Sequence, residues 1–395
     1  MVSNNRLMRK AAALAATALM AAMMFACSSC GESAASFSQE QRDQLDQAVT
    51  DFMEERHLPG VVVGAWVPGE GTYLTAKGYA DLEAGEVMED DVKFEIGSVT
   101  KSFVGTVALQ LVDEGKLALD DRLDEYVSYV PNGENITIRQ LLDMTSGLYN
   151  YLDDEDLETE VANDPLKKWS PEELVQVAVS HEPHFPPGEG WFYSNTNTIL
   201  VGMIIELITG SELEDEVRVR IIEPLGLENT SFPEESVTDP SLAQGYSYDT
   251  ETGEFARTQQ VDPSLYWAAG AMVSNTEDLK VWAEALGKGS LISDAMQQER
   301  LLFHEVISDD LPYFKTMDPG YGMALEKYDD PDCFIGHSGK TFSHNTQMYY
   351  LPSKEAVLIT LTNTPTIPGD GPEFFATFAK AVLPDAFPKF PGSQQ

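Results

Sequence analysis

A serine and a lysine stand three positions apart in Ser98-Val99-Thr100-Lys101, and this Ser-x-x-Lys pattern occurs once in the chain. In a helix the spacing places both side chains one turn apart on the same face. A serine hydroxyl becomes a strong nucleophile when a nearby base removes its proton. A lysine can be that base when its surroundings lower its pKa. The pair therefore predicts an enzyme that transfers acyl groups through a serine.

Two further motifs could complete such a site. Tyr-Ser-Asn at 193–195 follows the rigid turn at 186–188, and His-Ser-Gly at 337–339 ends a short segment with strand character. Both follow the Ser-x-x-Lys motif, and the three together span about 240 residues. One short motif alone is weak support for a function, because such patterns arise by chance. Three in this order, each beside a suitable helix or strand, predict one site assembled from distant segments.

In this order the motifs resemble those of the serine penicillin-recognising enzymes. The resemblance is closest to the branch that holds class C β-lactamases, low-molecular-weight D-alanyl-D-alanine carboxypeptidases and family VIII esterases, and it extends over roughly residues 38 to 385. The segments that carry it are 94–98, 140–148 (with Asp143-Met144 near the place where His is common), 185–188, 193–195, 269–274 and 336–339. It implies an α+β fold of the β-lactamase/transpeptidase type, with an antiparallel sheet flanked by helices and a helical insertion domain.

The resemblance implies catalytic roles for residues of the first two motifs. Ser98 attacks the substrate carbonyl and forms an acyl-enzyme. Either Lys101 or Tyr193 accepts the serine proton, and a coupled pair leaves this choice open. We expect the Tyr193 phenol to be partly ionised, because nearby positive charge favours the ionised form. Asn195 is expected to hold Lys101 and to contact the substrate amide.

The third motif is expected to bind the substrate. An oxyanion needs two donors, and the resemblance implies the backbone N–H groups of Ser98 and of Lys340, which follows Gly339. His337 is expected to polarise the site and to help bind a substrate carboxylate, with Ser338 and Gly339 beside it. The resemblance implies neither a metal nor any other cofactor.

Departures from class C β-lactamases narrow the expected substrates. The third motif begins with His337, where those enzymes usually have lysine and carboxypeptidase-like members often have histidine. Asn195 favours amide substrates, because many esterase relatives lack it, while residues 340–344 lack the Gly-Phe pair often found there. The leading hypothesis is a serine hydrolase acting on D-amino-acid peptides, β-lactams or related amides and esters, most like a D-alanyl-D-alanine carboxypeptidase. A carboxylesterase and a slow-turnover penicillin-binding envelope protein are the alternatives.

Patterns of apolar residues place these motifs in two domains. A buried helix is predicted from Ser98 to a stop at Gly115, and another over 196–209. Other predicted helices cover 38–57 and 374–383, and predicted strands cover 61–67, 72–79, 322–327, 333–336, 346–351 and 356–361. We therefore expect residues 38–115 and 265–390 to form a sheet domain and residues 116–264 a mainly helical domain.

The N-terminus has the features of an export signal. The first ten residues include the basic Arg6, Arg9 and Lys10, and the segment continues to residue 26 as an apolar run too short for a comfortable membrane span. Cys27 follows, as in bacterial lipoprotein signals, in which the cysteine becomes the first, lipidated residue; an ordinary secretory signal is the alternative. Residues 27–37 are small and polar and are expected to be a tether. We expect an exported protein, anchored on the outer side of a bacterial cytoplasmic membrane or else secreted.

The composition excludes one class of partner. The chain has 65 acidic and 25 basic residues and a formal net charge of −40. Nucleic-acid binding requires clustered Lys and Arg, so we expect a small-molecule substrate and no nucleic acid. Cys333 is the single cysteine outside the N-terminal region, which leaves no disulfide framework in the body of the protein.

Overall fold

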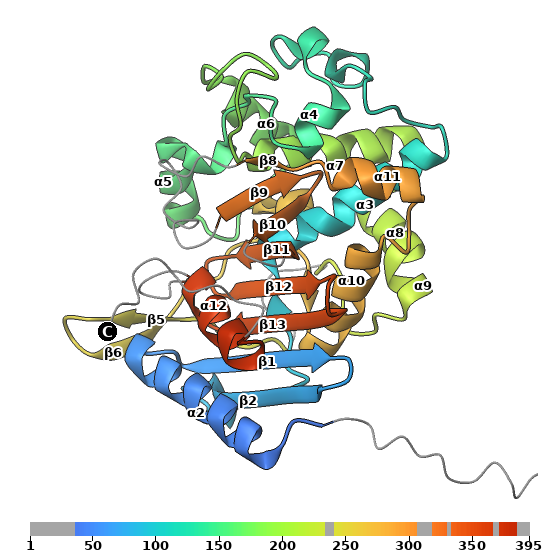
Figure 1. Cartoon of the computed structure of the whole chain (residues 1–395). Helices are drawn as coiled ribbons and strands as arrows, with labels where there is room; N and C mark the ends of the chain where they lie inside the picture. Colours follow the sequence, from blue (N-terminus) through green and yellow to red (C-terminus); the bar gives the residue numbers. More distant parts are fainter. Residues whose placement is uncertain (1–35, 234–240, 306–317, 330–332, 366–370, 385–395) are drawn as a thin grey trace, which may run out of the picture.

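The chain is folded around one antiparallel sheet. The computed structural model describes residues 36–233, 241–305, 318–329, 333–365 and 371–384, and nine strands of these residues form the sheet (Figure 1). In spatial order they are β3 (Glu86–Val87), β2 (Gly71–Asp81), β1 (Gly60–Val67), β13 (Ala356–Thr362), β12 (Asn345–Leu351), β11 (Cys333–Lys340), β10 (Leu325–Asp329), β9 (Asp318–Gly322) and β8 (His304–Glu305). The prediction of an antiparallel sheet built from both ends of the chain is confirmed.

Helices cover both faces of the sheet. Successive side chains of a strand point to opposite faces. Leu358 of β13 accordingly packs with α2 (Gln39–Arg56) and α12 (Gly371–Val382), where the rings of Phe52 and Phe374 are 4.6 Å apart. Its neighbour Ile359 belongs to the cluster that includes apolar residues of α10 (Thr276–Lys288), which contacts β12 and β13. Strands β12 and β13 are buried throughout, as expected for strands covered on two sides.

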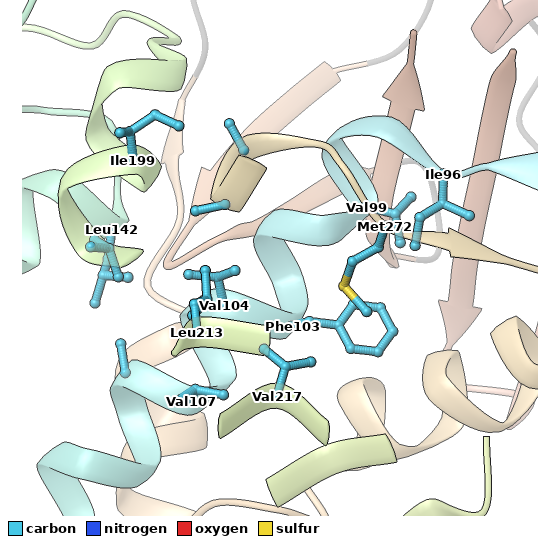
Figure 2. Close-up of a cluster of buried hydrophobic side chains, with 14 of the residues drawn as sticks. Ile96, Val99, Phe103, Val104, Val107, Leu142, Ile199, Leu213, Val217 and Met272 are labelled. Atoms are coloured by element: carbon cyan, nitrogen blue, oxygen red, sulfur yellow. The ribbon is translucent and has the colours of Figure 1, made fainter. Parts of the chain in front are cut away.

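The rest of the described chain is mostly helical, and two of its helices carry the expected motifs. α3 (Thr100–Asp113) and α7 (Asn195–Thr209) pack against each other. Figure 2 shows the apolar cluster around them, in which Val104 and Ile199 lie among side chains from several helices. The other elements are α4 (Ile138–Leu142), α5 (Glu155–Asn163), α6 (Pro171–Val179), α8 (Leu213–Val217), α9 (Glu223–Leu225), α11 (Asp294–Arg300) and the strand pairs β4 (Phe94–Glu95) with β7 (Val273–Ser274) and β5 (Tyr246–Asp249) with β6 (Glu254–Arg257).

The structure corrects three local predictions. Ser98 lies in a 3₁₀ turn, η1 (Gly97–Val99), and the α-helix begins two residues later. The strand predicted over 322–327 is broken by a tight turn, in which Ala324 has a φ of +52° and Leu325 pairs with Gly322. The strand predicted over 333–336 continues to Lys340, so the third motif lies inside β11. Glycine and lysine are depleted in strands, so Gly339 and Lys340 do not predict this continuation from the local sequence, and pairing with β12 stabilises it instead.

The predicted signal peptide (1–26) and the lipidation site Cys27 lie outside the described residues, as do all but the last two residues of the tether. Within the described part of the chain, no helix combines the length and the apolar character needed to cross a membrane. The other helices and strands predicted individually are present, including the β1–β2 hairpin, which closes between Val67 and Gly71.

Candidate active site

Ser98 and Lys101 lie where η1 joins the first turn of α3. The Lys101 ammonium nitrogen is 2.8 Å from Ser98 Oγ, so the predicted pairing of the two side chains is present. Lys101 has no exposed surface, whereas Ser98 is half-buried and therefore open to a substrate. The nucleophile thus faces solvent while its base is held inside the protein.

Lys101 is fixed by three hydrogen bonds. Besides Ser98, Lys101 Nζ donates to Asn195 Oδ1 at 2.7 Å and to the Ala269 carbonyl at 2.6 Å. Burial lowers the pKa of Lys101 to about 7, and the negative charge of Glu326 opposes this shift. A neutral lysine has two N–H groups and one lone pair, so it can keep both oxygen partners and accept a proton from Ser98. The geometry and the lowered pKa together suit Lys101 as the general base.

Tyr193 lies beside this pair, just before α7 begins. Its ring centroid is 5.0 Å from Lys101 Nζ, and its hydroxyl makes a hydrogen bond with Ser98. Burial raises the pKa of Tyr193 far above the value for a free phenol, the charge of Glu326 raises it further, and the bond to Ser98 acts against both. The expectation of a partly ionised phenol is therefore wrong. Tyr193 keeps its proton and is suited to donate it.

The third motif faces η1 from β11. A methyl group at Gly339 would lie 1.9 Å from the Ile96 carbonyl oxygen and 3.1 Å from the Ser98 nitrogen. A methyl group at Gly97, whose φ is +51°, would lie 2.5 Å from the Lys340 nitrogen. Glycine at both positions lets the two backbones approach this closely. β11 and η1 therefore lie in close contact beside the backbone nitrogens of Ser98 and Lys340, the two expected donors of the oxyanion hole.

His337 occupies a different position from the one expected. Its side chain is completely buried, its Nε2 is 3.2 Å from the Tyr321 hydroxyl, and its Nδ1 is 2.6 Å from the Ser338 carbonyl. Burial lowers the pKa of His337, the charge of Glu326 opposes this, and Lys101 adds to it. A neutral, fully enclosed imidazole cannot pair with a substrate carboxylate. His337 instead supports Tyr321, whose ring lies 5.9 Å from that of Tyr193.

Glu326 on β10 is a buried carboxylate that the sequence did not single out. It accepts hydrogen bonds from the Ser338 backbone at 2.8 Å, from Ser338 Oγ at 3.0 Å and from the Tyr349 hydroxyl at 2.7 Å. Its carboxylate lies 3.5 Å from His337 Nδ1. Glu326 therefore holds the third motif in place through Ser338, and it places a negative charge close to Lys101. A single glutamate in a strand gives no sequence signal for such a role.

Aromatic side chains form one wall of the site. Trp191 and Tyr193 both pack against Tyr321, with ring centroids 5.8 and 5.9 Å apart, and Met144 belongs to the same cluster. Asp143 and Met144 stand near the place where a histidine is common in the resembling segment. In this protein Asp143 is paired with His304 from β8 at 3.1 Å. Tyr321 and Met144 are buried, so the partly buried Trp191 and Tyr193 are the members of this wall with surface left for a substrate side chain.

The fold and these groups define a serine hydrolase of the β-lactamase/transpeptidase type. The family model described as Beta-lactamase matches residues 45–376, so the chain belongs to the Beta-lactamase family. Penicillin-binding protein 4* of Bacillus subtilis (strain 168) is 27% identical over 338 residues, which cover 82% of this chain and 72% of that protein. Protein flp of Staphylococcus aureus (strain MW2) is 29% identical over 62% of this chain, which spans about half (48%) of that relative.

Two solved structures are similar over nearly their whole length. A D-stereospecific amidohydrolase from Streptomyces sp. is 30% identical, with a TM-score of 0.74, and the match covers 86% of this chain and 97% of the other. The D-amino acid amidase from Ochrobactrum anthropi SV3, solved with D-phenylalanine, is 26% identical, with a TM-score of 0.75 over 86% of this chain and 99% of the other. The resemblance stated from the motifs is confirmed at the level of family and fold.

Proposed function

We propose that this protein hydrolyses amide bonds in which the acyl group comes from a D-amino acid, through an acyl-enzyme on Ser98. The observation that carries the chemistry is the fully buried Lys101, bonded to Ser98 Oγ and Asn195 Oδ1, with a pKa near 7. The stereochemical part rests on the similarity to the D-stereospecific amidohydrolase and the D-amino acid amidase.

In the proposed acylation step, Ser98 Oγ forms a bond to the substrate carbonyl carbon as its proton moves to Lys101. The carbonyl oxygen becomes an oxyanion held by the N–H groups of Ser98 and Lys340. The carbon–nitrogen bond then breaks as Tyr193 gives its proton to the leaving amine, and the proton on Lys101 restores the phenol. Water attacks the ester in the same manner and releases the acid, so that protons and bonds balance over the cycle.

Asn195 and the aromatic wall support an amide with an apolar side chain. Asn195 lies at the N-terminus of α7 beside the nucleophile and is the expected contact for the substrate amide. Trp191 and Tyr193, which are only partly buried, offer area to an aromatic or aliphatic side chain. The amidase complex with D-phenylalanine supports this choice of side chain.

The test compares matched substrates on one enzyme preparation. D-Phenylalanine amide, L-phenylalanine amide, a peptide ending in D-Ala-D-Ala, nitrocefin and a short nitrophenyl ester are assayed with the wild type and with Ser98→Ala. The proposal predicts that the D-amide has the highest kcat/KM and that Ser98→Ala removes its hydrolysis. Equal rates for both enantiomers, or a D-amidase activity that survives in Ser98→Ala, would refute it.

A D-alanyl-D-alanine carboxypeptidase is the second candidate. The histidine of the third motif and the similarity to penicillin-binding protein 4* favour it. The burial of His337 weighs against it, because a carboxypeptidase must hold a free substrate carboxylate. In the same assay, faster release of D-alanine from the peptide than hydrolysis of the D-amide would select this candidate.

We also propose that the protein is exported and tethered through lipid on Cys27. The support is the basic start, the apolar run and the cysteine at its end. Labelling of producing bacterial cells with an alkyne-bearing fatty acid tests the proposal, with Cys27→Ser beside the matched change Cys30→Ser. Label that is lost in Cys27→Ser alone supports lipidation, and label that is absent from the wild type contradicts it.

A further inference from the structure

A chain of hydrogen bonds connects Lys101 with the surface of the helical region. Lys101 Nζ donates to Asn195 Oδ1 at 2.7 Å, Asn195 Nδ2 donates to Asn150 Oδ1 at 3.0 Å, and Asn150 Nδ2 donates to Asp153 Oδ1 at 2.8 Å. Both asparagines are buried, whereas Asp153 is exposed. The chain thus runs from the buried lysine through two side-chain amides to a carboxylate at the surface.

The direction of both amides follows from one further contact. The backbone nitrogen of Asn195 also lies 3.0 Å from Asn150 Oδ1. A backbone N–H can only donate, so the oxygen of the Asn150 amide, and not its nitrogen, must face Asn195. The side chain of Asn195 must then present its NH₂ group to that oxygen and its own oxygen to Lys101. The ordinary ambiguity between amide oxygen and nitrogen does not arise here.

The two segments that carry the asparagines are clamped together. The Tyr149 carbonyl accepts hydrogen bonds from Ser194 Oγ at 3.1 Å and from Thr196 Oγ1 at 2.7 Å. The Tyr151 nitrogen donates to Thr196 Oγ1 at 3.2 Å. Asn150 is therefore held against Asn195 from both sides, and its side chain has one orientation available.

Asp153 completes the arrangement at the surface. An ionised carboxylate only accepts hydrogen bonds, so Asp153 binds the remaining NH₂ group of Asn150 and cannot turn it around. Two titratable groups interact electrostatically with the Asp153 carboxylate: His184 and Tyr149. Those that face Lys101 are Glu326 and His337, with the neutral Tyr193 beside them.

We propose that Asn150 is a positioning residue for the reaction, which with Asp153 holds the oxygen of the Asn195 amide toward Lys101. The inference rests on the proposed function, because it assigns Lys101 the role of base. If the Asn195 amide turned, it would present N–H groups to the lysine nitrogen. A donor facing Lys101 disfavours the ammonium and lowers the lysine pKa. The lysine would also lose one of the two oxygen partners that hold it beside Ser98.

The experiment measures kcat and KM for a D-amino acid amide across pH in Asn150→Ala, Asp153→Ala and Asp153→Asn. Asp154→Asn is the matched control, because Asp154 is the adjacent carboxylate and pairs with His181 instead of Asn150. We expect Asn150→Ala to lower kcat by about tenfold with a small change in KM. The acidic limb of the pH–rate profile of Asn150→Ala, where the rate falls as Lys101 is protonated, should move to lower pH by about half a unit. Asp153→Ala should show a smaller shift of the same sign, and Asp153→Asn, which keeps an acceptor, should recover part of the loss.

The inference is overturned if the acidic limb of the pH profile of Asn150→Ala lies at the wild-type pH. This holds if kcat is unchanged, and also if kcat falls only in proportion to the folded fraction measured by circular dichroism. If Asn150→Ala does not fold, the Asp153 variants provide the test. A pH profile of Asp153→Ala that coincides with that of Asp154→Asn overturns the inference. Activity that survives in Ser98→Ala would refute the proposed function itself. Loss of activity in Ser98→Ala together with silent Asn150 and Asp153 variants would refute the positioning role alone.

Discussion

Lys101 Nζ lies 2.8 Å from Ser98 Oγ, and no part of the lysine side chain is exposed. A buried ammonium group loses its hydration, which disfavours the charged form. Burial therefore lowers the pKa of Lys101 to about 7. The same burial has the opposite effect on Tyr193, which is a weaker acid than a free phenol. The two groups are therefore poised as a base and an acid at neutral pH.

The pH dependence of the reaction follows from this lysine. Neutral Lys101 is the reactive form, so kcat/KM should rise as the pH increases and reach half its plateau near pH 7. Lys101→Arg should lower kcat/KM by about 10² to 10⁴, the usual range for loss of a general base, because a guanidinium stays protonated. Initial rates from pH 5 to 9 test this. A wild-type profile without an acidic limb near pH 7 would contradict the assignment of Lys101.

Glu326 should determine the pH at which the acidic limb of the kcat/KM profile lies. Its negative charge raises the pKa of Lys101, so Glu326→Gln should lower this pKa and move the acidic limb to lower pH. Tyr349→Phe is the control, because it removes one hydrogen bond to Glu326 and leaves the charge in place. The two pH profiles should differ, with the limb of Tyr349→Phe at the wild-type position. Coincident profiles would show that the charge of Glu326 is not felt by the base.

Tyr193→Phe should separate amide from ester hydrolysis. The change keeps the ring against Tyr321 and removes the proton that the leaving amine needs. We expect kcat for an amide to fall by about 10² to 10⁴, and kcat for a nitrophenyl ester to fall much less, because nitrophenolate leaves without a proton. Parallel assays of both substrates give the comparison. Equal losses for both would assign Tyr193 a role in binding or packing and not in proton donation.

The contact between β11 and η1 should be intolerant of a side chain. Gly339→Ala would place a methyl group 1.9 Å from the Ile96 carbonyl oxygen, so β11 must move away and the oxyanion hole must open. We expect a loss of kcat of about 10² or more, comparable to loss of an oxyanion donor. Gly69→Ala is the comparison, because Gly69 has a φ of +83° and no atom near its added methyl group, so the change should lower stability alone. Retained kcat in folded Gly339→Ala would show that this close approach is dispensable.

The sequence was sufficient for the parts of the site that depend on local spacing. Ser98 and Lys101 meet because they are one turn apart, and Asn195 reaches Lys101 because both lie at the ends of packed, strongly apolar helices. The sheet was predictable from the apolar runs near both termini, and the helix observed over 39–56 from the pattern of apolar residues over 38–57. These features rest on patterns that the residues themselves carry.

Other parts of the site depend on tertiary contacts that leave no local pattern. The extension of β11 to Lys340 comes from pairing with β12, and the enclosure of His337 comes from Tyr321 and Glu326 on neighbouring strands. The protonation of Tyr193 was predicted incorrectly, because a motif shows nearby charge and does not show burial. Asn150 lies two residues after the segment at 140–148, yet its importance emerges only from its contacts with Asn195.

The most direct test of the proposed acyl-enzyme is intact-mass spectrometry of the protein, acid-quenched during turnover of a D-phenylalanine ester. An acyl-enzyme on Ser98 predicts a mass increase equal to the acyl group, which peptide mapping assigns to Ser98 and which is absent from Ser98→Ala. Turnover without any adduct in the wild type, together with undiminished turnover by folded Ser98→Ala, would contradict it.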